Sequence, residues 1–136
     1  MKDDCIFCKL ANGVFPTNSI YEDEDFNVIL DLAPATKGHA LILPKRHADN
    51  LYELPDETAE KALVLAKKLA KTMKDKLGCD GLNLVQNNGE VAGQTVLHFH
   101  MHLIPRYISD AQKIAWKPLE VPAEELVAVK ELLTKE

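Results

Sequence analysis

The sequence of 136 residues has no long apolar run, no excess of basic residues and only three cysteines. Its longest apolar stretches, such as residues 40–43, are far shorter than the roughly 20 residues that a membrane span needs, and its acidic start differs from a signal peptide. Because the net charge is -5, tight sequence-independent binding to nucleic acid is not expected, whereas single nucleotides remain possible ligands. We therefore expect a cytoplasmic protein that binds neither membranes nor nucleic acids.

The three cysteines are too few for a disulfide framework. Cys5 and Cys8 form a C-x-x-C pair and Cys79 stands alone. In a cytoplasmic chain such a pair more often binds a metal or takes part in redox chemistry than forms a structural disulfide. A redox pair of the thioredoxin type expects a βαβ context, which this N-terminus lacks. Free packing cysteines, or a structural zinc with two further nitrogen or sulfur ligands, remain open.

The length and composition fit one soluble domain spanning residues 1–136. Apolar periodicity and the positions of glycine and proline predict a short helical segment, strands, a long helix and a C-terminal helix. Short strands with mostly short connections favour an α+β fold, in which an antiparallel sheet of five strands packs on helices. The expected helices are residues 3–13, 56–77 and 123–135, and the expected strands are residues 20–21, 26–31, 39–43, 82–87 and 98–104.

The most informative stretch is residues 98–103, where histidine alternates with large apolar residues. A β-strand places His98, His100 and His102 on one face and the apolar residues on the other. Three polar rings on one face serve no packing purpose, because each ring nitrogen needs a partner. The first and last α-carbons are about 13 Å apart in a strand, which is too far for all three rings to share one metal. Nucleophilic catalysis, in which the middle neutral imidazole attacks phosphorus, fits better.

Residues 93–104 resemble the signature of the histidine triad family of nucleotide hydrolases and transferases. The resemblance extends through Asp31, the strand that starts at Gly38 and His39, and residues 44–47 and 87–89, and it covers most of residues 5–107. It implies a half-barrel-like sheet, a two-fold homodimer and a purine nucleotide substrate. It also implies attack of the middle histidine on an α-phosphate, giving a covalent nucleotidyl-histidine that water hydrolyses. Both phosphoramidase and dinucleoside polyphosphate hydrolase chemistry remain open.

The resemblance also implies roles for individual residues. His100 would be the nucleophile, and Asp31 would hold the ribose, since a carboxylate can accept hydrogen bonds from two vicinal hydroxyls. The residues expected at the phosphate or leaving group are His102, Gln94 and Thr95. The other residues expected to steady the site or to bind the nucleotide are Asn87, His39, Ile6, Phe7, Ile29, Leu32, Gly93 and Val96. Without the resemblance, Asp31 fits an ordinary turn residue, and Asn87 and Gln94 fit ordinary loop residues.

Some family members with an N-terminal C-x-x-C, and the related galactose-1-phosphate uridylyltransferases, bind zinc through two cysteines, a histidine after the strand expected at residues 39–43 and the first histidine of the motif. The same positions here are Cys5, Cys8, His47 and His98, so the resemblance implies a zinc site that fixes the N-terminal segment to the sheet. An alternative to the enzyme is a nucleotide-binding regulatory or scaffold protein with little turnover.

Overall fold

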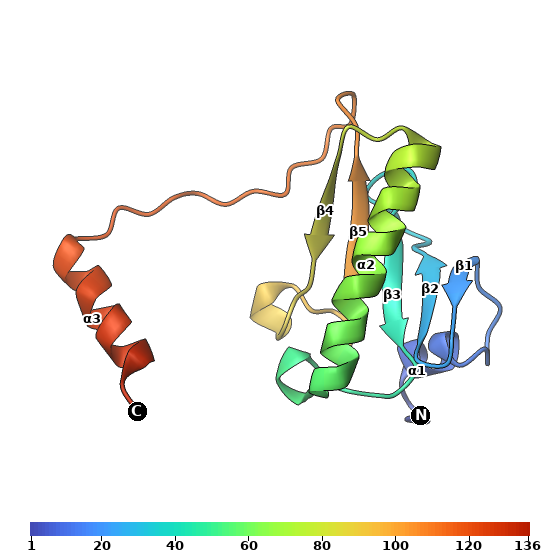
Figure 1. The fold of residues 1–136 in the computed structure, drawn as a ribbon, viewed down its shortest axis with the longest axis horizontal. Helices are drawn as coiled ribbons and strands as arrows, with labels where there is room; N and C mark the ends of the chain where they lie inside the picture. The colour runs from blue at the N-terminus through green and yellow to red at the C-terminus, as the bar shows by residue number, and fades with distance from the viewer.

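The structure, a computed structural model, describes residues 1–136 and is built around one antiparallel sheet (Figure 1). The sheet contains β1 (Ser19–Glu22), β2 (Phe26–Leu30), β3 (Ala40–Pro44), β4 (Gly81–Val85) and β5 (Met101–Arg106). Their spatial order is β1-β2-β3-β5-β4, so β5 lies between β3 and the edge strand β4. The helices are α1 (Ile6–Ala11), α2 (Asp56–Leu77) and α3 (Ala123–Thr134), and Leu51–Glu53 and Glu90–Ala92 form short 3-10 turns. The predicted α+β class and the five-stranded antiparallel sheet are confirmed.

Helix α2 runs across one face of the sheet (Figure 1). Its acidic first turn, Asp56 and Glu57, complements the helix dipole, and Gly78 ends it in the left-handed conformation with φ 62°. Its apolar stripe packs against alternate residues of the strands, and together they form the main core. The helix and strand residues in this core include Ala62, Leu65, Ala66, Leu69, Met73, Val28, Ile42, Met101 and Leu103.

The opposite face of the sheet is only partly covered, by the short helix α1. Ile29, Leu41 and Leu43 form a small second core there with α1. In the strand register, Ile29 lies opposite Leu41, and Leu41 lies opposite His102. This row of side chains across β2, β3 and β5 forms the floor of the site described below.

The histidine strand differs in its bounds from the prediction. It begins at Met101, because the N–H of Phe99 donates to the carbonyl of Ala48 (2.7 Å) instead of to a neighbouring strand. It also continues through Pro105. The pairing of β5 with β3 ends at Leu103, which lies opposite Ala40, so Pro105 needs no N–H on the β3 side. The Thr36 hydroxyl donates to the Pro105 carbonyl there. The predicted alternation is nevertheless confirmed, since Phe99, Met101 and Leu103 all lie in the main core.

Strand β4 ends at Val85, two residues before the predicted end at Asn87. The side-chain amide of Gln86 donates to that of Asn88 (2.9 Å), and the amide of Asn88 donates back to that of Gln86 (2.7 Å). This local turn takes the place of further backbone pairing between β4 and β5.

Beyond β5 the chain leaves the sheet. The Arg106 guanidinium donates to both carboxylate oxygens of Asp110 (3.0 and 2.9 Å) and to the amide oxygen of Asn83 (2.8 Å). The chain then extends to α3, which forms where the sequence predicts it but contacts no other element, as Figure 1 shows. No helix has the length and apolar character that a bilayer crossing requires.

Candidate active site and metal centre

A cavity of about 550 Å³ opens on the partly covered face of the sheet. Apolar side chains of α1, β2 and β3 form one wall, and polar side chains from the ends of β2 and β5 form the other. This volume and this mixed lining are typical of a small-molecule site. The lining residues are Phe7, Leu10, Pro16, Thr17, Asn18, Ile29, Leu30, Asp31, Leu32, Leu41, Thr95, His100 and His102.

The ring of His100 is fixed at the back of this cavity. Its Nδ1 lies 2.7 Å from the backbone carbonyl of His98. Because a carbonyl only accepts, Nδ1 carries the proton and Nε2 carries the free lone pair. The ring packs edge-on against Phe7, with centroids 4.8 Å apart. Burial lowers the pKa of His100, so the imidazole is neutral at pH 7. His100 therefore presents an oriented, neutral nucleophile.

His102 presents the opposite hydrogen-bonding character. The N–H of Ala35 donates to Nδ1 of His39 (2.9 Å), so Nε2 of His39 carries a proton and donates it to Nδ1 of His102 (2.9 Å). His102 must then hold its own proton on Nε2. Burial, with smaller effects of His100 and His39, lowers the pKa of His102 to about 4. A neutral donor thus stands beside the neutral nucleophile, with the ring centroids of His100 and His102 5.0 Å apart.

Asp31 lies at the mouth of the cavity, just after β2. One carboxylate oxygen accepts the N–H of Ala33 (2.9 Å), and the other lies 3.6 Å from Nε2 of His39. Asp31 therefore forms the turn that its sequence position predicts, and its remaining lone pairs can still accept hydrogen bonds from a ligand.

Several residues expected at the nucleotide lie outside the cavity lining. Both donors of the Gln94 amide are engaged, with the carbonyls of Asp49 (2.7 Å) and Val96 (3.0 Å), and its oxygen accepts the N–H of Gly89 (2.8 Å). In this conformation Gln94 has no free donor for a phosphate. The other residues outside the lining are Ile6, which is 46% exposed, and His39, Asn87, Gly93 and Val96. Nucleotide contacts by these residues stay predictions.

The sequence argument missed some of the cavity wall. Leu10 lies three residues after Phe7 in α1, and residues at that spacing lie on the same face of a helix. This spacing could have placed Leu10 beside Phe7 at the cavity. Leu41 could be found only from the register of β3 with β2 and β5.

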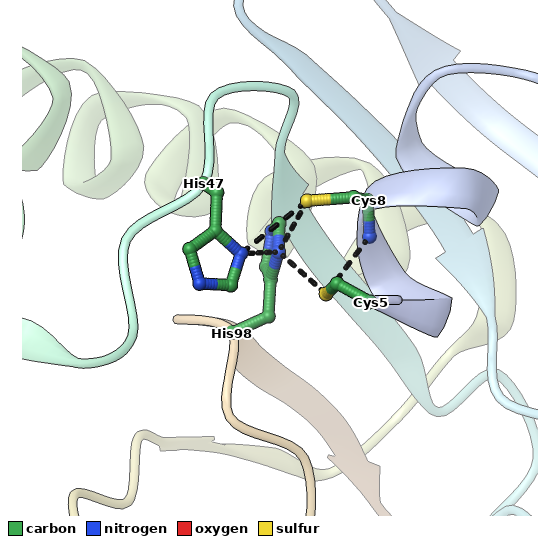
Figure 2. A group of neighbouring side chains, drawn as sticks. All are labelled: Cys5, Cys8, His47 and His98. Atoms are coloured by element: carbon green, nitrogen blue, oxygen red, sulfur yellow. Dashed lines mark hydrogen bonds between the residues drawn. The ribbon is translucent and has the colours of Figure 1, made fainter. Parts of the chain in front are cut away.

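Cys5, Cys8, His47 and His98 meet beside α1, and Figure 2 shows their side chains converging. Nδ1 of His98 lies 3.4 Å from the sulfur of Cys5 and 3.4 Å from that of Cys8. Nδ1 of His47 lies 3.3 Å from the Cys8 sulfur and 3.2 Å from Nδ1 of His98. The structure therefore brings together the four residues expected to bind zinc.

The hydrogen bonds around this cluster favour a cation at its centre. Nε2 of His98 donates to the carbonyl of Pro44 (2.9 Å), and Nε2 of His47 donates to the carboxylate of Asp49 (2.6 Å). Both Nδ1 atoms therefore carry lone pairs that face each other without a proton between them. Burial also raises the pKa of the Cys8 thiol, so a thiolate there needs a nearby positive charge.

The spacing of the four atoms fits zinc. Tetrahedral zinc with bonds of about 2.0–2.1 Å to nitrogen and about 2.3 Å to sulfur places two nitrogens about 3.4 Å apart, and a nitrogen and a sulfur about 3.5 Å apart. The distances given above lie close to these values. The residues present thus fit a closed four-ligand zinc site, in which Asp49 orients His47, a role that the sequence argument missed.

A family model for the HIT domain, the domain of the histidine triad family, matches residues 12–109. The chain belongs to the HIT family. Protein hit of Bacillus subtilis is 45% identical over 116 residues, which are 85% of this chain and 80% of that protein. An adenosine 5'-monophosphoramidase of Saccharomyces cerevisiae is 41% identical over 133 residues, which are 96% of this chain and 82% of that protein.

Solved structures of HIT proteins share the fold. A crystal structure of a Streptococcus mutans protein, 39% identical, superposes with a TM-score of 0.94 and covers 99% of this chain and 86% of that chain. A zinc-bound histidine triad family protein of Mycobacterium smegmatis, 35% identical, has a TM-score of 0.77 and covers 98% of both chains.

Proposed function

We propose that this HIT protein hydrolyses the bond between the α-phosphate of a purine nucleotide, most simply an adenosine nucleotide, and a leaving group. The observation that carries the proposal is the pairing of a neutral nucleophile, Nε2 of His100, with a neutral donor, Nε2 of His102, at the polar wall of one cavity. The adenosine 5'-monophosphoramidase of yeast supports this substrate class.

In the proposed reaction, the lone pair of His100 Nε2 attacks the α-phosphorus. A P–N bond to His100 forms as the bond to the leaving group breaks, and the His98 carbonyl then accepts a hydrogen bond from the positively charged ring. Nε2–H of His102 donates to a phosphate oxygen, where negative charge develops. Water then attacks phosphorus and releases His100. Over both steps, water supplies a proton to the leaving group and a hydroxyl to the phosphate.

The rest of the cavity fits a nucleoside. Asp31 can accept hydrogen bonds from both ribose hydroxyls, and Thr95 can donate to a phosphate oxygen. The apolar wall can enclose a flat base, with Phe7, Leu10 and Ile29 in contact with it.

The decisive test compares wild-type protein with His100→Ala on an adenosine phosphoramidate and on a diadenosine polyphosphate, side by side. We expect His100→Ala to lose turnover of the preferred substrate while it keeps nucleotide binding. Brief reaction of wild-type protein should add the mass of one nucleotidyl group at His100. Cys79→Ser, which changes a cysteine outside the cavity, is the matched control. Unchanged turnover in His100→Ala would refute the assignment, and binding without turnover in wild-type protein would favour the regulatory or scaffold alternative.

We also propose that Cys5, Cys8, His47 and His98 hold a structural zinc. The convergent lone pairs and the atom spacing support this, as does the zinc-bound HIT structure from Mycobacterium smegmatis. The ion would tie α1, which carries Phe7 and Leu10, to the sheet. Elemental analysis of purified protein tests it: we expect one zinc per chain in wild type and none in the Cys5→Ser, Cys8→Ser variant. Zinc-free wild-type protein, or zinc retained by the variant, would contradict the proposal.

A two-fold homodimer and a cytoplasmic location complete the proposal. Exposed apolar side chains on α2 and β4, including Leu63, Val64 and Leu84, support self-association. Cys5 and Cys8 form no disulfide with each other, which fits a reducing compartment.

A further inference from the structure

The cavity contains two polar side chains for which the proposed reaction has no use. Its polar lining residues are Thr17, Asn18, Asp31, Thr95, His100 and His102. The proposed reaction places the last four at the phosphate and the ribose. Thr17 and Asn18, in the segment that leads into β1, are left over. The one polar part of a nucleoside monophosphate that has no partner yet is the edge of its base.

Asn18 lies on the side of the site that faces away from the histidines. Its backbone carbonyl accepts the N–H of Leu30 (3.0 Å), and Asp31 directly follows Leu30 at the end of β2. Asn18 therefore lies on the β1 side of Asp31, whereas His102 lies in β5, on the other side of β2 (Figure 1). A nucleotide with its phosphate at His102 and its ribose at Asp31 thus extends its base toward Asn18.

The amide of Asn18 is available to a ligand. Neighbouring polar side chains are bonded within the protein: the Asn12 amide donates to two backbone carbonyls (2.8 and 3.0 Å), and the Ser19 hydroxyl donates to the side chain of Asn27 (2.6 Å). The Asn18 side chain makes no such bond and lines the cavity instead. Because the bond to Leu30 fixes the backbone of Asn18, the amide projects from a defined point at the cavity wall.

A primary amide matches the edge of adenine. It offers a donor and an acceptor side by side, whereas the hydroxyl of Thr17 has a single oxygen for both. The 6-amino group of adenine donates and the adjacent ring nitrogen accepts, so one amide can make both bonds. Guanine can pair with the amide through N1–H and O6 if the amide turns over, but its 2-amino group then finds no acceptor on Asn18. The amide thus favours adenine over guanine.

We propose that Asn18 binds the edge of the base and gives the site its preference for adenine. The inference rests on the proposed function and names the residue that selects among its substrates. Since the base edge lies far from the reacting bond, Asn18 contributes to binding in the ground state and the transition state alike.

Steady-state kinetics with adenosine and guanosine 5'-phosphoramidates test the proposal. Asn18→Ala should raise KM for the adenosine substrate about fivefold and leave kcat unchanged, because it removes uniform binding at an exposed edge. Asn18→Asp should reverse the preference to about tenfold in favour of guanosine, because a carboxylate accepts both N1–H and the 2-amino group of guanine but repels N1 of adenine.

The matched control is Asn50→Asp, which makes the same chemical change outside the cavity. Asn50 caps the Leu51–Glu53 turn, where aspartate serves as well as asparagine, so both substrates should behave as with wild-type protein. The two substrates also control for charge. Simple repulsion of the phosphate by the new carboxylate of Asn18→Asp would weaken both substrates equally, and that unchanged ratio would contradict contact with the base.

Equilibrium binding of adenosine and guanosine 5'-monophosphates by calorimetry separates this inference from the proposed function, because binding needs no turnover. Binding without turnover in wild-type protein would refute the proposed function, and the ratio of the two affinities in the Asn18 variants would still test Asn18. A ratio that neither Asn18→Ala nor Asn18→Asp changes would refute the role of Asn18 and leave the proposed function intact. Wild-type protein that binds neither nucleotide would refute both.

Discussion

Gln94→Ala is the substitution that best separates two roles for one side chain. The family resemblance places Gln94 at the phosphate, whereas the structure engages its whole amide in three hydrogen bonds within the protein. These bonds link the Gly89 turn to the backbone of Asp49, whose carboxylate in turn orients His47. Gln94 is only 7% exposed, so water cannot readily replace the lost amide.

The expected loss of stability follows from these bonds. A hydrogen bond contributes about 1 kcal/mol net, and more when its removal leaves a buried partner unsatisfied. Three bonds to one buried side chain therefore give a loss of about 2–3 kcal/mol in the free energy of unfolding. In a domain of this size, that loss lowers the melting temperature by about 6–15 °C.

The assay combines thermal unfolding with turnover measured well below the melting temperature. Gln94→Glu should destabilise at least as much, because its carboxylate faces the carbonyls of Asp49 and Val96. The matched control is Gln86→Ala, which also removes an amide with local hydrogen bonds. Because Gln86 lies in a partly exposed turn, this substitution should lower the melting temperature less. An unchanged melting temperature together with a collapse of turnover in Gln94→Ala would refute the structural role and support direct contact with the phosphate.

Three further predictions concern other parts of the molecule. Gly38→Ala should lower the free energy of unfolding in urea by about 2–3 kcal/mol, because φ is +92° and a Cβ would lie 2.5 Å from the Leu77 side chain. Gly13→Ala is the control and should lower the free energy of unfolding less, because its φ is also positive, at +77°, but a Cβ there would meet nothing within 4 Å. The His102 pKa of about 4 in the native state, below the ordinary 6.5, means that the unfolded state binds more protons between these values. The contribution of His102 to stability is therefore complete above pH 6.5 and is lost as pH falls toward 4, by about 1–2 kcal/mol after allowance for its partial exposure, and His102→Gln should flatten this dependence. Asp49→Asn should weaken zinc binding about 10–100-fold in competition with a chelating dye, and an unchanged affinity would contradict the orienting role of Asp49.

The sequence predicted the parts of the fold that follow from periodicity. The positions of α2 and α3 and the alternation of histidine with apolar residues in the histidine strand agree with the structure. The predicted apolar stripe of α2 agrees except at Leu63, which is 60% exposed, while Leu65 takes a place in the core. Strand bounds agreed less well, because they depend on long-range partners. The carbonyl of Ala48, about fifty positions away in the chain, accepts the N–H of Phe99 and delays the start of β5. Pro105 stays in the strand because β3 begins at Ala40, which lies opposite Leu103 and leaves Pro105 without a β3 partner.

The family motif predicted only part of the cavity lining, since Gln94, Gly93 and Val96 of the same motif lie outside it. His100, His102, Asp31 and Phe7 do line one cavity, and their roles at a nucleotide stay predictions. Leu41 lines the cavity because of the strand register, which the sequence does not give. Asp49 contacts His47 of the metal cluster because the chain turns just after His47 and brings the carboxylate to Nε2 of that ring. The apolar groove between α2 and β4 likewise joins residues that no local pattern connects.

His98 serves two neighbouring sites with different parts of one residue. Its ring faces the cysteines, whereas its backbone carbonyl fixes the Nδ1 proton of His100. Every amino acid carries that carbonyl, so the orientation of the nucleophile does not require histidine at this position. A chain that gave up the metal could replace this first histidine and still keep its chemistry, whereas position 100 has no comparable freedom. The three histidines of the motif thus carry different requirements, and a substitution of the first tests the proposed zinc site while it keeps the carbonyl that bonds to Nδ1 of the second.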